Sequence, residues 1–283
     1  MRKKNSPWLN APYVLWSALF ILAPLALVAV FAFTDQAGRF SLASFEYIAQ
    51  NQQLYLKTFG DSLAYALEAT VICLLLAFPL AYFMANARQR TQRLLMMLIM
   101  VPMWMNFVIC TYSWRSILED HGILNTALAW LHGLVSKEAF RPPALLDTPG
   151  AVVLGMVYNY LPFMILPIYT VMSKLEPSLT EAAQDLGANR WRVLEQVVVP
   201  LSIPGVVSGV TMVFVPSVST FYISQKLGGG SSLIGDLIEL QFLGSAYNFS
   251  LGAALSLILM AIVLVCMLVM KQFSDGEESA FVV

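Results

Sequence analysis

Charged residues are scarce in this sequence, because Asp, Glu, Lys and Arg together make up only 12% of its 283 residues. A soluble domain carries about 25% charged residues, and half that supply cannot cover the surface of a soluble globule of this size. The scarcity excludes a soluble cytoplasmic enzyme, a nucleic-acid-binding protein and a disordered chain. The net charge of −1 also implies no overall attraction for a charged partner.

The patterns that mark disulfides, zinc sites and nucleotide-binding loops are missing as well. The three cysteines, Cys73, Cys110 and Cys266, lie far apart in apolar stretches, which favours a role as small apolar side chains in helices. The glycines at 228–230 are followed by no G-K-[ST] motif, so they do not form a phosphate-binding loop. We therefore expect this chain to contain no catalytic residue, no cofactor and no metal site.

Long apolar runs, in contrast, are abundant. A helix needs about 20 mostly apolar residues to cross the hydrocarbon core of a lipid bilayer, and six runs meet this requirement. The predicted spans are Tyr13–Phe33, Leu63–Met84, Leu94–Tyr112, Ala151–Met172, Pro200–Phe221 and Leu251–Met270. The sequence thus predicts an all-α polytopic membrane protein, with an N-terminal helix and loop (residues 1–62) followed by a core of five spans (residues 63–283).

The loop charges predict how these spans are oriented. With the N-terminus in the cytoplasm, ten of the sixteen Lys and Arg residues fall in the inside segments, although those segments are the shorter set. The strongest contribution comes from the short loop 85–93, which contains Arg88, Arg90 and Arg93. Short loops carry the positive-inside signal best, so we expect both termini to be cytoplasmic.

The predicted cytoplasmic segment 173–199 carries its own signals for the starts and ends of helices. Pro177 blocks continuation of the preceding span, and Ser178 with Glu181 predicts a capping box at the start of a short helix. Gly187 is placed to end that helix in a left-handed conformation, and Asn189 to begin a second helix that runs up to Pro200. These signals predict a compact helix–turn–helix that is polar at its tip, with Ala182, Ala183 and Leu186 on a small apolar face.

The run from Glu181 to Gly187 (EAAQDLG), followed by Pro200–Gly205 (PLSIPG), is similar to the EAA signature of binding-protein-dependent ABC importer permeases. The resemblance implies a type I importer permease fold in which segment 173–199 fits a cleft of an ATP-hydrolysing partner. We therefore call residues 173–199 the coupling segment. The residues implied in this contact are Glu181, Ala182, Ala183, Asp185, Leu186 and Gly187. Further stretches resemble the polyamine branch of the family, namely Val101–Asn106, His121–Asn125, Tyr158–Tyr169 and Leu227–Phe242.

This resemblance implies a permease subunit of an ATP-driven importer in a bacterial inner membrane. The implied partners are a paralogous permease subunit, two ATP-binding subunits that hold ATP and Mg²⁺, and an extracytoplasmic substrate-binding protein. The implied cargo is a polyamine such as spermidine or putrescine. Two alternatives stay open: the same machine with another solute, such as another organic cation, sulfate or an iron chelate, and an ATP-independent secondary transporter or channel, which leaves the EAA segment unexplained.

Polar residues in the spans are candidates for the substrate pathway. Glu68 invites an explanation because a charged side chain at mid-membrane costs about 2.5–3.5 kcal/mol; it either reaches the outer interface or lines a vestibule that favours cations. Trp104, Asn106, Tyr158, Asn159 and Tyr160 offer aromatic faces and amides that suit an ammonium ligand. Helix packing explains them as well, and Tyr158 and Tyr160 are expected on different faces.

Asp236 and Glu239 lie three residues apart in a predicted outside helix, Leu233–Phe242. Residues at this spacing share a helix face, and a solvated acidic face is the simplest interpretation. The sharper hypothesis is that the pair contacts a docked binding protein or gates a cation.

Overall fold

The computed structural model describes residues 7–35, 38–135, 142–230, 232–244 and 247–278, which form helices joined by turns and loops, with one isolated bridge between Thr34 and Phe40. The basic residues Arg2, Lys3 and Lys4 of the orientation argument lie outside the described residues. The chain divides into two compact units, one made of residues 1–57 and 237–262 and the other of 58–236 and 263–283.

Within the described residues, five helices are long and apolar enough to cross a membrane, namely Pro12–Ala32, Gln52–Asn86, Pro149–Met172, Arg190–Val218 and Phe249–Gln272. A sixth candidate consists of two helical stretches, Gln89–Trp104 and Phe107–Gly133, which meet at an angle of 92°. Each predicted span therefore has a counterpart, and the all-α membrane fold is confirmed. The third span, Leu94–Tyr112, was expected as one helix, and this expectation is wrong because the chain bends sharply within it.

The first unit contains the N-terminal helix and parts of α13 and α14. Helices α1 (Pro7–Ser17) and α2 (Ala23–Ala32) are joined without interruption by a π-helical turn, and α3 (Ala43–Gln50) follows. Ala32 packs with Ala253 and Ala254 of α14 (Phe249–Glu278) in a small core. The small side chains let these helices approach closely, as membrane helix interfaces require.

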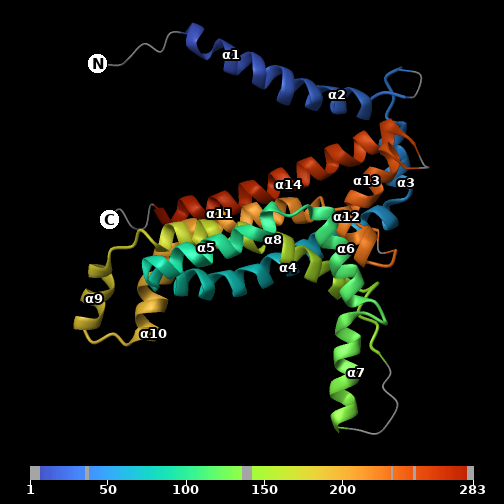
Figure 1. The fold of residues 1–283 in the computed structure, drawn as a ribbon. Coiled ribbons are helices and arrows are strands. Elements are labelled where there is room, and N and C mark those ends of the chain that lie inside the picture. Colours follow the sequence, from blue (N-terminus) through green and yellow to red (C-terminus); the bar gives the residue numbers. More distant parts are fainter. Residues whose placement is uncertain (1–6, 36–37, 136–141, 231, 245–246, 279–283) are drawn as a thin grey trace. The chain divides into compact units, whose positions relative to one another are not determined.

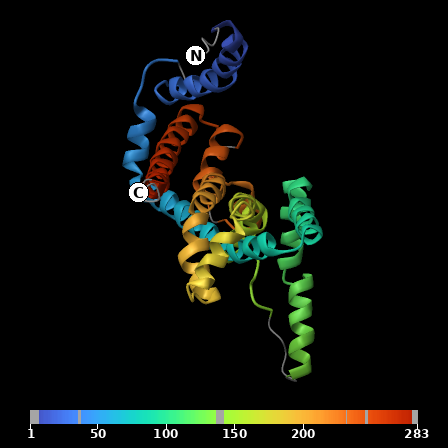
Figure 2. The same ribbon diagram turned by 90° about the vertical axis from the view of Figure 1, so that its left-hand side faces the viewer.

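The second unit contains most of the predicted core, and Figure 1 labels its helices. The elements are α4 (Gln52–Asn86, from residue 58), α5 (Gln89–Trp104), α6 (Phe107–Leu118), α7 (Ile123–Val135), α8 (Pro149–Met172), α9 (Pro177–Asp185), α10 (Arg190–Val193), α11 (Val199–Val218), α12 (Tyr222–Leu227) and the first turn of α13 (Ile234–Phe242). Its largest helix contact joins α8 to α11, which lie side by side in both views (Figures 1 and 2).

Glycines of α11 make this close contact possible. A Cβ atom on Gly205 would lie 2.9 Å from the carbonyl oxygen of Pro167, and one on Gly209 would lie 2.7 Å from Sδ of Met164. Two glycines four residues apart form the small-xxx-small pattern by which helix backbones approach each other in membranes. Gly205 is the last residue of the PLSIPG run, so this part of the sequence pattern has a packing role.

A stripe of small residues also lines the buried face of α4. Ala69, Cys73, Ala77 and Ala81 recur every four residues and have no exposed surface. Sγ of Cys73 lies 3.9 Å from the carbonyl oxygen of Val157 in α8. Cys73 therefore serves as a small side chain in a helix contact, as predicted from its apolar surroundings.

Candidate functional site

The first helix of the coupling segment has its N-cap two residues earlier than the predicted capping box places it. Helix α9 starts at Pro177, with Glu176 in the N-cap position, and the Ser178 hydroxyl donates to Oε2 of Glu176 at 3.3 Å. The predicted capping box of Ser178 and Glu181 is therefore wrong. Proline has a backbone angle suited to the first helical position and no N–H that needs a cap, so Pro177 takes that position itself.

The turn after α9 is confirmed in detail. Gly187 has a φ of +86°, its N–H donates to the carbonyl oxygen of Gln184 at 2.8 Å, and the N–H of Ala188 donates to that of Ala183 at 3.0 Å. This pair of hydrogen bonds is the Schellman motif, which closes a helix on a left-handed residue. Two residues later, Oδ1 of Asn189 accepts from the N–H of Arg192 at 2.8 Å and caps α10 as predicted.

The exposed surface of the coupling segment is more apolar than predicted. Leu186 stands at the tip with 90% of its surface exposed, and Leu179 and Trp191 are exposed as well. Ala183 instead packs against the hydrophobic core of its unit. The predicted apolar face is therefore divided, because Ala182 and Leu186 are exposed whereas Ala183 packs against the core. Glu181, Ala182, Asp185 and Gly187 are exposed beside it.

The second helix of the coupling segment does not stop at Pro200. Arg190–Val218 forms one helical stretch of 29 residues, in which the π-helical turn Leu194–Val198 links α10 to α11, and the N–H of Val199 donates to the carbonyl oxygen of Leu194. Wider π turns accommodate local distortion of a helix, such as that caused by a proline. The tip of the coupling segment is thus joined to a membrane span by continuous helix (Figure 1).

Two of the predicted pathway residues, Trp104 and Asn106, lie at the bend of the third span. Helix α5 ends at Trp104, whose side chain is 88% exposed, and α6 begins at Phe107. Oδ1 of Asn106 accepts from the N–H groups of Val108 at 2.9 Å and Ile109 at 3.4 Å. Asn106 is thus the N-cap of α6, and its amide oxygen already satisfies backbone groups at the bend.

The three candidates on α8 point to different partners. Tyr158 packs edge-on against Trp114 with ring centroids 5.3 Å apart, whereas the Tyr160 hydroxyl donates to the carbonyl oxygen of Pro216 at 3.4 Å. The amide of Asn159 donates to the carbonyl oxygen of Gly155 in its own helix at 2.8 Å. The two tyrosines therefore face different sides, as expected. Within the described part of the chain, no hydrogen bond or ring contact joins these residues to Trp104 or Asn106.

Glu68 and Ala69 are neighbours on α4 with opposite environments. Glu68 is exposed, whereas Ala69 belongs to the buried stripe. Glu68 therefore points away from the core of its own unit. Both interpretations of this residue, a side chain that reaches the interface and one that lines the pathway, require this orientation.

Asp236 is not part of a solvated acidic face. Its side chain is only 8% exposed, Oδ1 accepts from the Ser224 hydroxyl at 2.9 Å, and Oδ2 accepts from the N–H of Leu233 at 2.8 Å. The hydroxyl of Ser62 in turn accepts from the N–H of Ile234 at 2.9 Å. The simplest prediction for Asp236 is therefore wrong, because the carboxylate caps the start of α13 and ties it to α12. Glu239 is half-buried.

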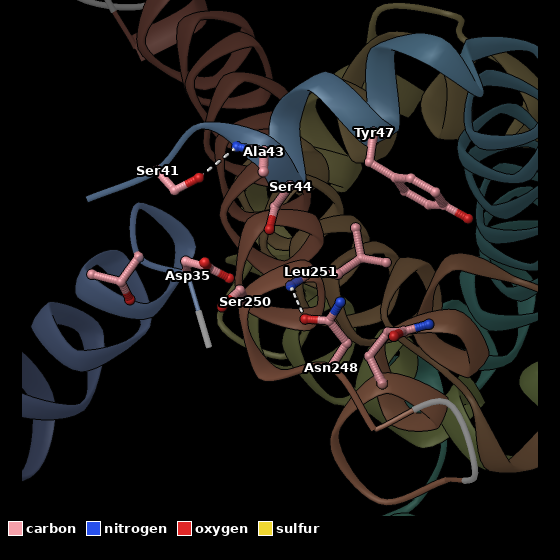
Figure 3. A pocket seen from close by; sticks show the side chains of 10 residues that line it. Asp35, Ser41, Ala43, Ser44, Tyr47, Asn248, Ser250 and Leu251 are labelled. Carbon is pink, nitrogen blue, oxygen red and sulfur yellow. Dashed lines mark hydrogen bonds between the residues drawn. The ribbon is translucent and has the colours of Figure 1, made fainter. Parts of the chain in front are cut away.

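The first unit contains a polar pocket that the sequence did not reveal (Figure 3). It has a volume of about 470 Å³ and lies between the start of α3 and the start of α14, and Asp35 and Ser44 point into the same space. At its edges, the Ser41 hydroxyl accepts from the N–H of Ala43 at 3.1 Å, and Oδ1 of Asn248 accepts from that of Leu251 at 3.1 Å. Hydroxyl, amide and carboxylate groups therefore line the pocket at two helix starts, and such groups can hydrogen-bond a small polar group.

A second group of residues that the sequence did not reveal lies where α6 meets α12. Nζ of Lys226 lies 5.6 Å from the ring centroid of Tyr112 and 5.7 Å from that of Tyr222. Tyr222 also packs against Phe107, with ring centroids 6.1 Å apart. A partial signal was present, because Lys226 follows Tyr222 by four residues and a helix places such residues side by side. Nothing in the sequence indicated that Tyr112 joins them.

Comparison with known proteins identifies the family. The family model described as "Binding-protein-dependent transport system inner membrane component" matches residues 77–275, which is well over half of the chain. The chain belongs to this family. As a member, it is a multi-pass transport component of the inner membrane and not an enzyme, and the matched region includes the whole coupling segment.

One relative and two solved structures place this permease more closely. The spermidine/putrescine transport system permease protein PotB of Salmonella typhimurium (strain SL1344) is 35% identical over 275 residues, which cover 93% of this chain and 94% of the relative. A chain of a bacterial ABC transporter involved in the import of the acidic polysaccharide alginate superposes with a TM-score of 0.78 at 17% identity, covering 95% of this chain and 96% of that one. A structure of bacterial alginate ABC transporter in complex with an alginate pentasaccharide-bound periplasmic protein gives 0.74 at 15% identity, covering 94% and 92%. The permease thus has the type I importer fold that was predicted.

Proposed function

We propose that this permease subunit forms half of the translocation pathway of an ATP-driven importer for polyamines such as spermidine and putrescine. The cargo assignment is supported by the likeness to PotB, which extends over 93% of the chain. The pathway includes Glu68 and the polar and aromatic residues Trp104, Asn106, Tyr158, Asn159 and Tyr160. Carboxylate and aromatic groups favour ammonium ligands, whereas an anionic cargo would need basic groups.

The coupling segment is the contact with the energy source. Glu181, Ala182, Ala183, Asp185, Leu186 and Gly187 sit in a cleft of a partner that binds ATP and Mg²⁺ and hydrolyses the ATP. The exposed Leu186 supports this role, because a side chain 90% exposed at the end of a fixed turn gains apolar burial only when a partner covers it. This exposed apolar tip is the observation that carries the proposal.

The helical connection explains how movement reaches the membrane. Because Arg190–Val218 is continuous helix, displacement of the coupling segment by the ATPase moves α11, and α8 follows through the glycine contact. Closure of two ATPase subunits thereby opens the pathway to the outside, and hydrolysis resets it. This cycle is alternating access between two conformations.

One such chain does not make a whole importer. Two ATPase subunits need two coupling segments, so a paralogous permease subunit completes the pair, and an extracytoplasmic binding protein delivers the cargo. The solved alginate importer with its bound periplasmic protein supports the last of these partners. Asp236 and Glu239 are proposed to lie near the binding-protein contact, where Asp236 shapes the backbone between α12 and α13. Both termini are placed in the cytoplasm.

Reconstitution with the partner subunits tests the proposal. Proteoliposomes that contain this chain, its paralogue and the ATPase are supplied with binding protein, radiolabelled putrescine and internal ATP. We expect putrescine uptake that needs both ATP and the binding protein, and copurification of the ATPase with the permease pair. If another solute were taken up and putrescine were not, that solute would replace polyamines as the proposed cargo. Uptake by this chain alone under an ion gradient, without ATP, would identify a secondary transporter instead.

A further inference from the structure

The ammonium group of Lys226 lies against a pair of tyrosine rings. Its Nζ is 5.6 Å from the centroid of Tyr112 and 5.7 Å from that of Tyr222, both within the distance of about 6 Å at which a cation is attracted to an aromatic face. The two rings meet edge to face, with centroids 6.3 Å apart and an interplanar angle of 78°. Two rings from two different helices therefore converge on one cation.

Both aromatic rings are close neighbours of this ammonium group. Among the described residues, no carboxylate forms an ion pair with Lys226. On the short helix α12, Ile223, Ser224 and Leu227 are buried, whereas Lys226 and Tyr222 are only half-buried and Tyr112 is exposed. The rings thus lie on the open side of the α6–α12 contact, where a group from outside the chain can reach them once Lys226 moves away.

The chemistry of the lysine side chain suggests what that outside group is. Four methylenes that end in a primary ammonium form a 4-aminobutyl group. The same group makes up each end of 1,4-diaminobutane (putrescine) and one arm of spermidine. Lys226 therefore presents to the two rings the chemical group that a polyamine would present.

We propose that Tyr112 and Tyr222 form a binding site for a primary alkylammonium group, which Lys226 occupies in this structure and which the cargo takes over during transport. The inference rests on the proposed polyamine cargo. Two ammonium groups repel each other at short distance, so the site holds either Lys226 or the cargo. A long flexible lysine returns easily to solvent when displaced, and it fills the site again when the cargo leaves.

Equilibrium binding of radiolabelled putrescine to the assembled importer, purified without its binding protein, tests the site. Lys226→Met keeps the apolar stem and removes the competing charge, and we expect it to lower the Kd for putrescine by about fivefold. Lys226→Arg keeps a cation on the rings and should show no such gain. In the Lys226→Met background, Tyr222→Leu should cancel the gain, whereas Tyr222→Phe, which keeps the ring, should preserve it.

Matched controls separate this site from general charge and folding effects. Lys57→Met removes an exposed lysine that has no aromatic contact in the described structure, and it should leave the Kd unchanged. The elution profile of each complex shows whether a substitution disturbs assembly. Lys226→Gln is a second variant that removes the charge, so a defect of one variant alone can be recognised. n-Butylammonium should compete with putrescine in the Lys226→Met importer, whereas the uncharged 1-butanol should not.

The outcomes distinguish this inference from the proposed cargo. An unchanged Kd in both Lys226→Met and Lys226→Gln, or a gain that survives Tyr222→Leu, would overturn the alkylammonium site while putrescine uptake by the wild type still supports the cargo. Absence of putrescine uptake by the wild type would reject the cargo. In that case, direct binding of radiolabelled n-butylammonium to the Lys226→Met importer decides the site, and lack of that binding overturns it.

Discussion

The amide of Ala188 and the carbonyl oxygen of Ala183 are joined by a hydrogen bond of 3.0 Å across the turn made by Gly187. This bond closes α9 and returns the chain toward the membrane, so that Asn189 can begin the next helix at once. A short turn with its backbone groups satisfied resists bending. We therefore expect the coupling segment to pass a displacement on to α11 without absorbing it.

Replacement of Gly187 should uncouple transport through backbone conformation alone. A Cβ atom there would meet nothing within 4 Å, but φ is +86°, and residues other than glycine pay about 1–2 kcal/mol for a left-handed conformation. We expect Gly187→Val to abolish most ATP-driven uptake while the amount of protein in the membrane stays the same. Gly187→Asn should retain much more uptake, since asparagine tolerates this region. Equal uptake by the valine and asparagine variants would contradict the role of the turn.

Leu186→Glu should break the contact with the ATPase without unfolding the permease. The side chain is already 90% exposed, so the substitution costs little in the isolated subunit, but it places a charge in what we expect to be a buried interface. Copurification of the ATPase should fall at least about tenfold, in line with a hot-spot residue. The matched control is Leu243→Glu, at a leucine that is 80% exposed in the first unit. If both variants retained the ATPase equally, the apolar tip would not be the docking surface.

Gly209→Ala should loosen the contact between α8 and α11. The new methyl would lie 2.7 Å from Sδ and 3.1 Å from the carbonyl oxygen of Met164, and such overpacking costs about 1–3 kcal/mol. The midpoint of thermal unfolding should fall by several degrees. Gly133→Ala in α7, where a Cβ meets nothing within 4 Å, should leave the midpoint unchanged or raise it, because alanine favours helix. A drop of the same size in both variants would argue against a specific close approach.

Asp236→Ala should destabilise the connection between α12 and α13. The substitution leaves the N–H of Leu233 without its acceptor in a buried place, at a cost of about 1–3 kcal/mol, and it removes one of the two acceptors of the Ser224 hydroxyl, which keeps the carbonyl oxygen of Phe221 at 2.7 Å. Asp236→Asn keeps one acceptor oxygen and should lose less. Thermal unfolding of the purified complex measures both, and uptake at permissive temperature should persist. Loss of uptake with unchanged stability would instead indicate a direct role in gating or in contact with the binding protein.

Local chemistry explains why the turn of the coupling segment could be predicted from the sequence. The left-handed glycine, the asparagine cap and the apolar spans each depend on residues close together in the chain, and all three are confirmed. The capping box failed for an equally local reason, since Pro177 competes with Ser178 for the helix start.

The remaining features depend on partners far away in the sequence. In the sequence Asp236 resembles a surface acid, whereas in the structure it is buried between Ser224 and the start of α13. The ring of Tyr112 lies near Lys226 because the chain bends at Asn106, where α6 begins. The bend itself escaped prediction because the run 94–112 is predominantly apolar, so hydropathy does not reveal that Asn106 caps a new helix inside it.

The π turn at Leu194–Val198 fixes the direction in which the coupling segment points. Each residue of an α-helix turns the chain by about 100°, so a turn with one additional residue changes the rotational phase between α10 and α11 by about that angle. Leu186 would face a different direction if the turn were regular. Deletion of a single residue from this turn should thus rotate the tip away from the proposed ATPase contact, while leaving every side chain of the tip in place.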